Sequence, residues 1–266
     1  MPPQYSVVIP VYNSAPVVAA TVAQTIAFFN RCGASCEIIV VNDGSTDRSW
    51  EVLREIADVN ACVTAIDLAS NYGQHTATFY GLTLTTGDIV ITLDDDLQQP
   101  PGEIARLIQK SEEGHDLVCG RFLRSRWAVR GLASGTIGLV DRWLFDRPRD
   151  FVFTSFRLMR RDVVERLCGY RLRDPYLRGL LVRCASNPGN VWVEHRPRPV
   201  GRSGYGPIKI ARFAARIWRT YRDLRGNHPR GPSLALQVRE TIGGGRRSRE
   251  PEPAWRSSGP RRGPGP

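Results

Sequence analysis

Residues 86–104 read TGDIVITLDDDLQQPPGEI, and this stretch decides the fold class. A short apolar run ends in three consecutive aspartates, Asp94, Asp95 and Asp96, and a double proline follows. Runs of Val and Ile that are too short for a buried helix indicate buried strands. Three carboxylates at the end of such a strand repel one another unless a cation offsets their charge. The alternative is an acidic turn that is simply solvated.

Similar runs occur three more times before this stretch, as YSVVIPV, CEIIVVN and CVTAIDL. Segments of helical length lie between the runs, at 16–32, 46–58 and 74–85, and a further helix at 101–113 precedes a strand at 116–119. This alternation predicts an α/β fold of the Rossmann-like kind, with a mostly parallel sheet covered by helices on both faces. Beyond it we expect helices near 128–145 and 161–167, an extended FVFTSFRLM and a strand near 191–195.

The charge of this 266-residue chain, +11 in total, is unevenly distributed. Residues 1–120 carry 5 Lys and Arg against 15 Asp and Glu, residues 121–200 carry 17 against 7, and residues 201–266 carry 15 against 4. An acidic part followed by a basic part indicates a site that joins a cation to anionic ligands, and a dipolar surface without function is the alternative.

The sequence also bears on the compartment. Six cysteines without a CxxC pair favour a reducing compartment. The first residues lack the basic flank and apolar core of a secretory signal, and no run approaches the roughly 18 apolar residues of a spanning helix. We therefore expect a cytoplasmic protein, soluble or lying on the cytosolic face of a membrane.

Ligands of open parallel sheets bind beyond the carboxyl ends of the strands, and three strands here end in suitable residues: 10–13, 42–45 and 94–96. Residues two apart on an extended chain point the same way, so Asp94 and Asp96 can converge while Asp95 faces elsewhere. Carboxylate oxygens suit Mg²⁺ or Mn²⁺, and Gln98 can add a carbonyl oxygen. Which of the three aspartates hold the metal stays open at this point.

Several motifs, in this order, carry a resemblance to a known family: VVIPVYN, IIVVNDGSTD, NYGQHTATFYGL, TTGDIVITLDDDLQQPP, SFRLMRRDVV and RPVGRSGYGPIK. Over about residues 5–212 the chain resembles the inverting family 2 glycosyltransferases with the nucleotide-sugar-binding GT-A fold, in particular their polyprenyl-phosphate branch. The resemblance implies that the donor is a nucleotide diphosphate sugar, most simply a UDP-sugar.

The resemblance also assigns residues to the donor. Asp94, Asp96 and Gln98 match the metal-binding DxDxQ motif of the family, and Asp95 stands where the family often has a small residue. Asp96 is taken as catalytic, and Asp43 as accepting a hydrogen bond from a uracil-like ring. The resemblance places the following residues around the donor: Pro10, Tyr12, Asp43, Asn71, Gly73, Gln74, Asp94 and Asp95. His75 is either a surface residue at a helix start or a sugar contact.

The acceptor is expected to meet the basic second half of the chain. A polyprenyl phosphate is already ionised and needs cations rather than a base, and arginine forks suit phosphate oxygens. The implied acceptor residues are Arg121, Arg157, Arg198, Ser203 and Tyr205, with Arg157 also counted as catalytic. A glycan or lipid hydroxyl is the alternative acceptor, and it would need a general base, for which Asp150 is the candidate.

Residues 208–225 form a predicted amphipathic helix. At 100° per residue one face carries Ile210, Phe213, Ala214, Ile217, Tyr221 and Leu224, and the other carries Lys209, Arg212, Arg216, Arg219 and Arg222. With Trp218 near the boundary, the pattern suits an anionic membrane surface, and the alternative is a helix packed on its own domain.

The predicted organisation is a glycosyltransferase domain at 1–205, with a donor half at 1–120 and an acceptor half at 121–205, then the basic helix at 206–225. Residues 226–266, rich in Gly, Pro and Arg, are predicted to be disordered. A scaffold that keeps the fold without turnover is a further hypothesis. Nucleic-acid binding is disfavoured because the tail has one aromatic residue, Trp255, and no stacking pattern.

Overall fold

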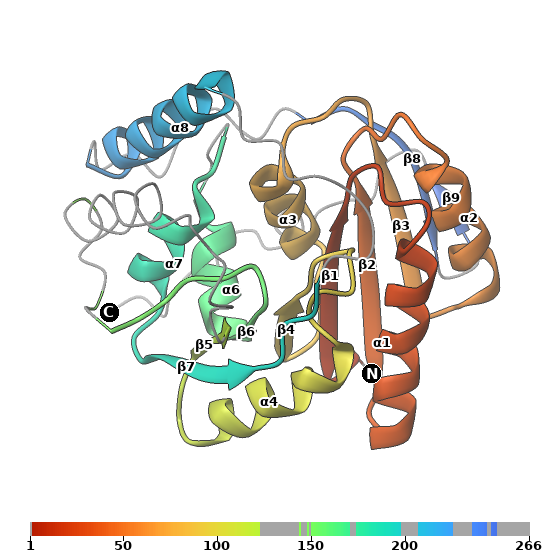
Figure 1. The fold of residues 1–266 in the computed structure, drawn as a ribbon, viewed down its shortest axis with the longest axis horizontal. Helices are drawn as coiled ribbons and strands as arrows, with labels where there is room; N and C mark the ends of the chain where they lie inside the picture. The colour runs from red at the N-terminus through yellow and green to blue at the C-terminus, as the bar shows by residue number, and fades with distance from the viewer. Residues whose placement is uncertain are drawn as a thin grey trace, which may run out of the picture.

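The four Val- and Ile-rich runs form the centre of a single sheet (Figure 1). Strands β1 (Tyr5–Val11), β2 (Cys36–Asn42), β3 (Val63–Leu68) and β4 (Ile89–Thr92) are all parallel, in the order β4-β1-β2-β3. Every residue of β1 is buried, as expected of a strand covered on both faces. The computed structural model describes residues 2–122, 150–170, 174–197, 207–225, 236–243 and 246–248, together with Leu144 and Pro148.

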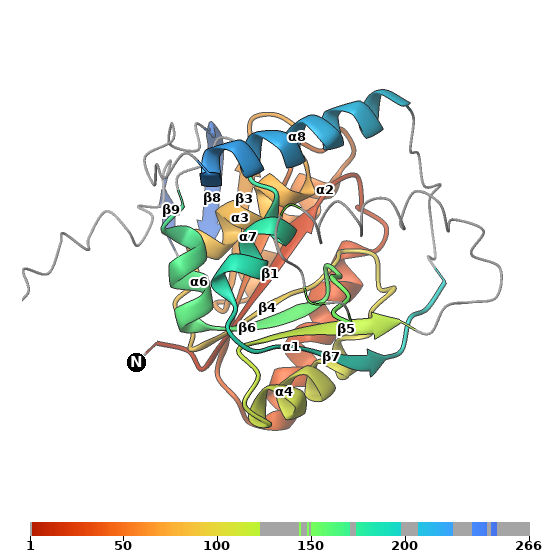
Figure 2. The same cartoon turned by 90° about the vertical axis from the view of Figure 1, so that its left-hand side faces the viewer.

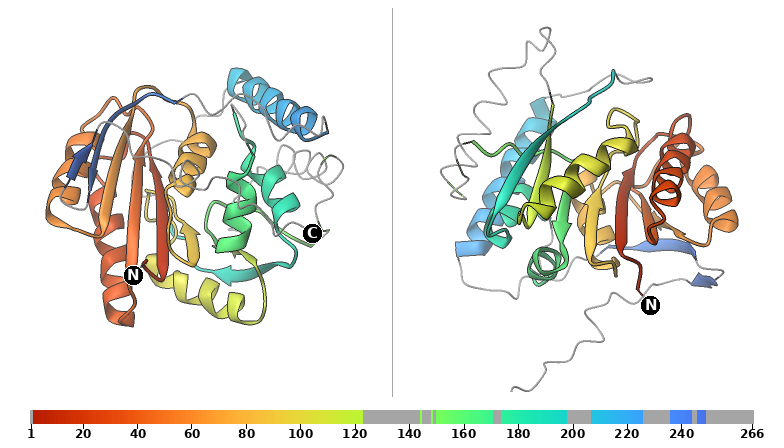
Figure 3. Two further views of the ribbon diagram at one scale, coloured as in Figure 1. Left: turned by 180° about the vertical axis from the view of Figure 1, so that it is seen from behind. Right: turned by 90° about the horizontal axis from the view of Figure 1, so that it is seen from below.

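Antiparallel pairs extend the sheet on both sides. Beside β4 lie β6 (Arg157–Arg160), β5 (Leu117–Phe122) and β7 (Pro188–Val193), with β6 antiparallel to both of its neighbours and β7 parallel to β5. Beside β3 lie β8 (Val238–Gly243) and β9 (Arg246–Ser248), which Figure 3 shows at the other edge of the sheet. Within the described residues the strand order is β7-β5-β6-β4-β1-β2-β3-β8-β9.

Helices cover both faces of the sheet, as the alternation predicts. One face carries α1 (Val18–Cys32), α2 (Ser49–Val59) and, after the 3₁₀ turn Pro101–Glu103, α4 (Ile104–Glu112). The other carries α3 (Gln74–Thr83), α6 (Arg161–Cys168) and α7 (Leu177–Cys184). Adjacent residues of β1 point to opposite cores, Val7 into the first and Val8 into the second. The α/β prediction is confirmed.

Helix α8 (Pro207–Arg225) packs on the domain beside α7 (Figure 2). The contact is made by Ile217 against Tyr176, with Tyr221 and Leu224 at its margin. Of the predicted apolar face Ala214 is exposed, and of the predicted basic face Arg216 is turned inward and partly buried. The two faces are therefore rotated from those the sequence predicts. None of the helices in the described ranges is long and apolar enough to cross a bilayer.

The prediction of disorder throughout 226–266 is wrong for β8 and β9. β8 pairs with β3, for example Ala65 with Ile242, and buries Thr241 and Ile242. The pairing supplies partners for backbone groups that would otherwise form an open edge of the central sheet. Composition averages over the tail and hides this short alternating segment. The helix predicted at 128–145 falls outside the described residues except for Leu144.

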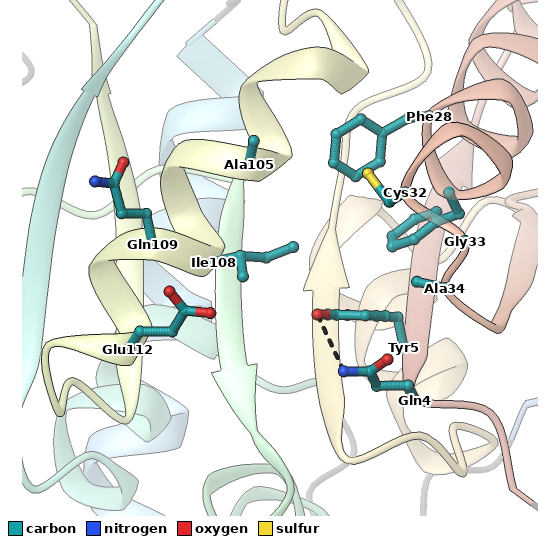
Figure 4. Close-up of a pocket in the computed structure, with 11 residues that line it drawn as sticks. Gln4, Tyr5, Phe28, Cys32, Gly33, Ala34, Ala105, Ile108, Gln109 and Glu112 are labelled. Carbon is teal, nitrogen blue, oxygen red and sulfur yellow. Dashed lines mark hydrogen bonds between the residues drawn. The ribbon is translucent and has the colours of Figure 1, made fainter.

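A cavity of about 380 Å³ opens between α1 and α4 (Figure 4). Gln4 and Tyr5, at the amino end of β1, form part of its wall together with Phe28 and Ile108. It therefore lies at the opposite end of β1 from Tyr12 and the strand ends that carry the polar motifs.

Candidate functional site

The three aspartates that follow β4 make different contacts. Asp94 accepts hydrogen bonds from Gln74 Nε2 (2.6 Å) and Gln99 Nε2 (3.0 Å), and a further one from the hydroxyl of Ser155. Asp95 instead accepts from the backbone amide of Tyr12 at the end of β1 (3.2 Å). Asp94 and Asp95 thus face different ways, as the alternation along an extended chain predicts.

The backbone of this turn is unusual. Leu97 has a φ of 58°, in the left-handed region that bulky residues rarely adopt. Asn13, after β1, also has a positive φ of 53°. The turn at Leu97 lets the amide of Gln98 donate to Asp96 Oδ1 at 3.1 Å. Strained backbone of this kind concentrates at functional sites.

Burial raises the pKa values of two of these carboxyl groups. The pKa of Asp94 is raised by desolvation and by the charge of Asp96, against the hydrogen bonds from Ser155 and Gln99. Desolvation raises the pKa of Asp95 to about 6, with smaller contributions from Asp94 and Asp96. A cation placed between such groups would favour their charged forms.

The residues at this turn fit a divalent cation that is shared with a ligand. Mg²⁺ in proteins is held by one or two carboxylates together with substrate phosphates. In the described part of the chain no group of three His, Cys, Asp or Glu side chains is placed to hold a metal ion. A cation between Asp94 and Asp96 would need phosphate oxygens of a ligand as further partners. The buried Oε1 of Gln99, whose Nε2 already binds Asp94, has no hydrogen-bond partner and is a further oxygen at this place.

The side-chain amide that contacts the aspartates is that of Gln99, which donates to Asp94, whereas Gln98 contacts Asp96 through its backbone amide. The Nε2 of the Gln98 side chain donates to the backbone carbonyl of Arg196 at 3.4 Å, and the backbone carbonyl of Gln98 accepts from the backbone amide of Arg196 at 2.8 Å. Gln98 thus joins the turn to the segment after β7. Gln99 and Ser155 lie within the quoted motifs TTGDIVITLDDDLQQPP and SFRLMRRDVV, but neither was singled out from the sequence.

Asp43 fixes the loop before α3, which we call the donor loop (residues 69–74). It is only 2% exposed, and its two oxygens accept from the backbone amides of Tyr72 (2.7 Å) and Gly73 (2.8 Å). Desolvation raises the pKa of Asp43 to about 6 despite these bonds and the charge of Arg216. The predicted contact to a uracil-like ring would come in addition to these bonds.

The donor loop joins the ends of two strands. Asp43 follows β2, whereas Gln74, at the start of α3, binds Asp94 after β4. Gly44 is needed here because it has a φ of 63° and its missing Cβ would come within 2.5 Å of the Ser70 carbonyl carbon. Of the predicted donor residues, Pro10 is buried in β1, while Tyr12 and Asn71 are exposed.

His75, the residue after Gln74 in α3, is partly buried, and the centroid of its ring lies 5.7 Å from that of the Tyr176 ring. Its pKa is lowered well below the ordinary value, by burial first and then by the charges of Arg216, Arg157 and Arg178. His75 is therefore neutral near pH 7. These three arginines belong to β6, α7 and α8.

The predicted acceptor residues differ in burial, and three of them lie outside the described residues. Arg157 is 5% exposed and its Nε donates to Thr92 Oγ1 at 3.0 Å, two residues before Asp94. Arg121 is exposed, with its guanidinium 4.7 Å from the ring centroid of Trp192. Asp150 is exposed. Arg198, Ser203 and Tyr205 lie outside the described residues, so their roles stay predictions.

Comparisons with known proteins agree with this arrangement. Residues 6–168 match the sequence model of the family described as glycosyl transferase family 2. An undecaprenyl-phosphate 4-deoxy-4-formamido-L-arabinose transferase of Edwardsiella ictaluri is 37% identical over 209 residues, which are 77% of this chain and 64% of the relative. The enzyme of that name from Pectobacterium carotovorum is also 37% identical, over 77% of this chain and 63% of its own. This chain thus spans just under two thirds of the length of these relatives.

Solved structures share the fold. Mannosyl-3-phosphoglycerate synthase from Rubrobacter xylanophilus superposes with a TM-score of 0.62 at 17% identity, covering 87% of this chain and 78% of its own. Glucosyl-3-phosphoglycerate synthase from Mycobacterium tuberculosis, in complex with Mn²⁺, UDP-glucose and phosphoglyceric acid, gives 0.54 at 20%, covering 84% and 79%. These neighbours have the GT-A fold, and this chain has the same fold. Because the family model covers more than half of the sequence, the chain belongs to glycosyl transferase family 2.

Proposed function

We propose that this protein is an inverting, metal-dependent glycosyltransferase that moves a sugar from a nucleotide diphosphate sugar to a polyprenyl phosphate. The observation that carries the proposal is the bridge from Asp43 through the donor loop to Asp94. It brings the buried carboxylate of Asp43 and the partly buried carboxylate of Asp94 from two strand ends to one edge of the sheet, where ligands of such folds bind. The names of the curated relatives support the acceptor, and the UDP and Mn²⁺ complexes of structural neighbours support the donor.

Asp94 and Asp96 would hold the Mg²⁺ or Mn²⁺ ion. When bound, the ion would offset the negative charge that develops on the departing diphosphate. Asp95 is engaged with the end of β1 and holds that strand end against the acidic turn. Gln74 and Ser155 orient the Asp94 carboxylate, since each donates to one of its oxygens.

Arginines supply what an ionised acceptor needs. An acceptor phosphate requires no general base, but its approach to a diphosphate requires cations. Arg157 is buried next to Thr92, and within the described residues its guanidinium has no carboxylate within salt-bridge distance. Its charge interacts with that of Asp94 and would also attract an anion at this site, and we assign it to the acceptor phosphate together with Arg121, Arg198, Ser203 and Tyr205.

The outer surface of α8 would place the protein on the cytosolic face of a membrane. Trp218 is 59% exposed, and Arg219 and Arg222 are exposed on the same helix. Aromatic and basic side chains together bind anionic lipid surfaces.

The test is transfer itself. The full chain is incubated with a panel of labelled UDP- and GDP-sugars, undecaprenyl phosphate and Mn²⁺, and label is counted in the organic phase. We expect metal-dependent label there, lost with EDTA, in Asp94→Asn and in Asp96→Asn but retained in Asp58→Asn, an exposed aspartate of α2. Transfer to water or to a glycan hydroxyl instead would contradict the phosphate acceptor, and no turnover with any donor would contradict the activity.

A further inference from the structure

We propose that Arg216 of α8 is a positioning residue for the donor site, which holds the donor loop in the conformation that Asp43 and Asp94 require. The inference rests on the proposed function and adds to it a role for the C-terminal helix. Three sets of contacts support it.

Arg216 is directed away from the membrane-facing surface of α8 and into the domain. Its Nε lies 2.6 Å from Asp174 Oδ1, and both side chains of this ion pair are mostly buried. Its Nη2 donates to the carbonyl of Tyr72 at 3.4 Å. Charge attraction to Asp174 thus keeps the guanidinium beside the loop, with Nη2 against the carbonyl of Tyr72, which lies 144 positions earlier in the chain.

The second set of contacts is at Gly73. A Cβ on this residue would lie 3.1 Å from Arg216 Nη2 and 3.6 Å from Nη1, so the guanidinium packs on the glycine backbone. Gly73 has a φ of 90°, a conformation that is strained for any residue with a side chain. The arginine therefore covers the one point of the loop where the chain must bend, immediately before Gln74 and its bond to Asp94.

The third set comes from the C-terminal strand. The carbonyl of Gln237 accepts from the Ala69 amide at 2.8 Å, and Arg239 Nη2 donates to the Ala69 carbonyl at 2.7 Å. The Gln237 amide donates to the hydroxyl of Tyr72 at 3.4 Å. The C-terminal segment thus holds the first residues of the loop, and Arg216 holds its last ones.

Arg216 also acts on the loop through its charge. It favours the ionised form of Asp43, the form that accepts from the amides of Tyr72 and Gly73. Loss of the guanidinium removes a contact at Gly73 and at the same time weakens the bonds that Asp43 makes to the loop. We therefore expect a loop that opens more often and a donor that binds less tightly.

The experiment measures the loop and the donor separately, with the full chain. Hydrogen exchange of peptides covering residues 69–80 and 214–224 is followed without ligand, and the Kd of UDP with Mn²⁺ is measured by calorimetry. Arg216→Gln is compared with Arg222→Gln, an exposed arginine of the same helix that is 69% exposed. In Arg216→Gln we expect faster exchange in the peptide 69–80 and a UDP Kd raised about tenfold, the size expected for loss of a hydrogen bond to a charged group. In Arg222→Gln we expect the exchange rates and the UDP Kd of the wild type.

Two further variants keep the inference testable if Arg216→Gln folds poorly. Arg216→Lys retains the charge beside Asp174 but not the planar contact with Gly73, and Asp174→Asn frees the guanidinium to turn. Both should give a smaller rise in Kd than Arg216→Gln, and in turnover the KM for the donor should rise more than kcat falls.

The outcomes are distinct. Faster exchange in 214–224 alone, with an unchanged loop and UDP Kd, would show that Arg216 only packs α8, and would overturn the inference while leaving the proposed function intact. A wild-type protein that binds no nucleoside diphosphate would overturn the proposed function and the inference with it.

Discussion

The ionisation of Asp43 gives a prediction with a calculable magnitude. Burial raises its pKa from 3.8 to about 6, so the folded protein binds a proton at Asp43 that the unfolded chain releases. A carboxyl group with a raised pKa contributes stability that is fully present below the unfolded pKa and is lost as the pH rises through the folded pKa. The protein therefore gains stability from Asp43 as the pH falls from about 7.5.

The gain follows from the two pKa values. With 3.8 unfolded and about 6 folded, linkage gives about 1.4 kcal/mol between pH 7.5 and pH 5, and about 3 kcal/mol at pH values below both. Asparagine cannot titrate, so Asp43→Asn should lack this contribution. The difference in unfolding free energy between wild type and variant should thus change by about 1.4 kcal/mol across that interval.

Urea unfolding at pH 7.5, 6 and 5 measures this difference, and taking it between two proteins removes the titration of all groups that they share. Asp58→Asn, at an exposed position of α2, is the matched control. The reasoning is refuted if the difference between wild type and Asp43→Asn is independent of pH, or if wild type gains stability relative to the variant as the pH rises.

Three further predictions concern the acceptor, the loop and the membrane. Arg157→Lys should raise the KM for the acceptor phosphate several-fold with little change in the UDP Kd, because a lysine cannot replace the arginine fork; equal losses of both would contradict its acceptor role. Gly73→Ala should cost about 1 kcal/mol or more of stability and weaken UDP binding, because Gly73 has a φ of 90° and packs on Arg216. Gly102 has open space around it and no positive φ, so Gly102→Ala should change neither the stability nor the UDP binding. Trp218→Ser should reduce sedimentation of the protein with vesicles that contain anionic lipid and leave the UDP Kd unchanged. Undiminished vesicle binding would contradict the proposal that α8 binds the membrane.

The central fold could be predicted because its signals are local. Continuous Val and Ile runs mark strands that are buried on both faces, and the intervening lengths leave room only for helices, so β1 to β4 and α1 to α3 were found close to their actual bounds. The start of α2 was placed at 46, whereas the helix begins at Ser49. In the structure Asp47 binds the amide of Ser49, while Ser45 binds Asn42 and the amide of Asn13.

The outer parts of the sheet depend on contacts that a local pattern does not carry. The segment VRETIG is too short to stand out within an Arg- and Gly-rich tail, and it is a strand because β3 offers it an open edge. Helix α7 was not predicted. Its buried residues pack in the second core, beside α6, and this packing depends on contacts between segments that are distant in the sequence.

The candidate site shows the same division. The different directions of Asp94 and Asp95 agree with alternation along an extended chain, and the place of Asp43 follows from its position after β2. Arg216 was assigned to the basic face of the predicted helix because a helical pattern records angles but not which neighbour a side chain meets. Its partners, Asp174 and Gly73, lie 42 and 143 positions away in the sequence.

The central claim is that Asp94 and Asp96 hold a divalent cation that also binds the diphosphate of the donor. Anomalous diffraction from crystals of the full chain grown with UDP and Mn²⁺ tests it most directly. The account predicts a manganese peak within coordination distance, about 2.0–2.6 Å, of an oxygen of Asp94 or Asp96 and of a UDP phosphate. A peak bound elsewhere, or UDP bound with no manganese beside these carboxylates, would contradict it.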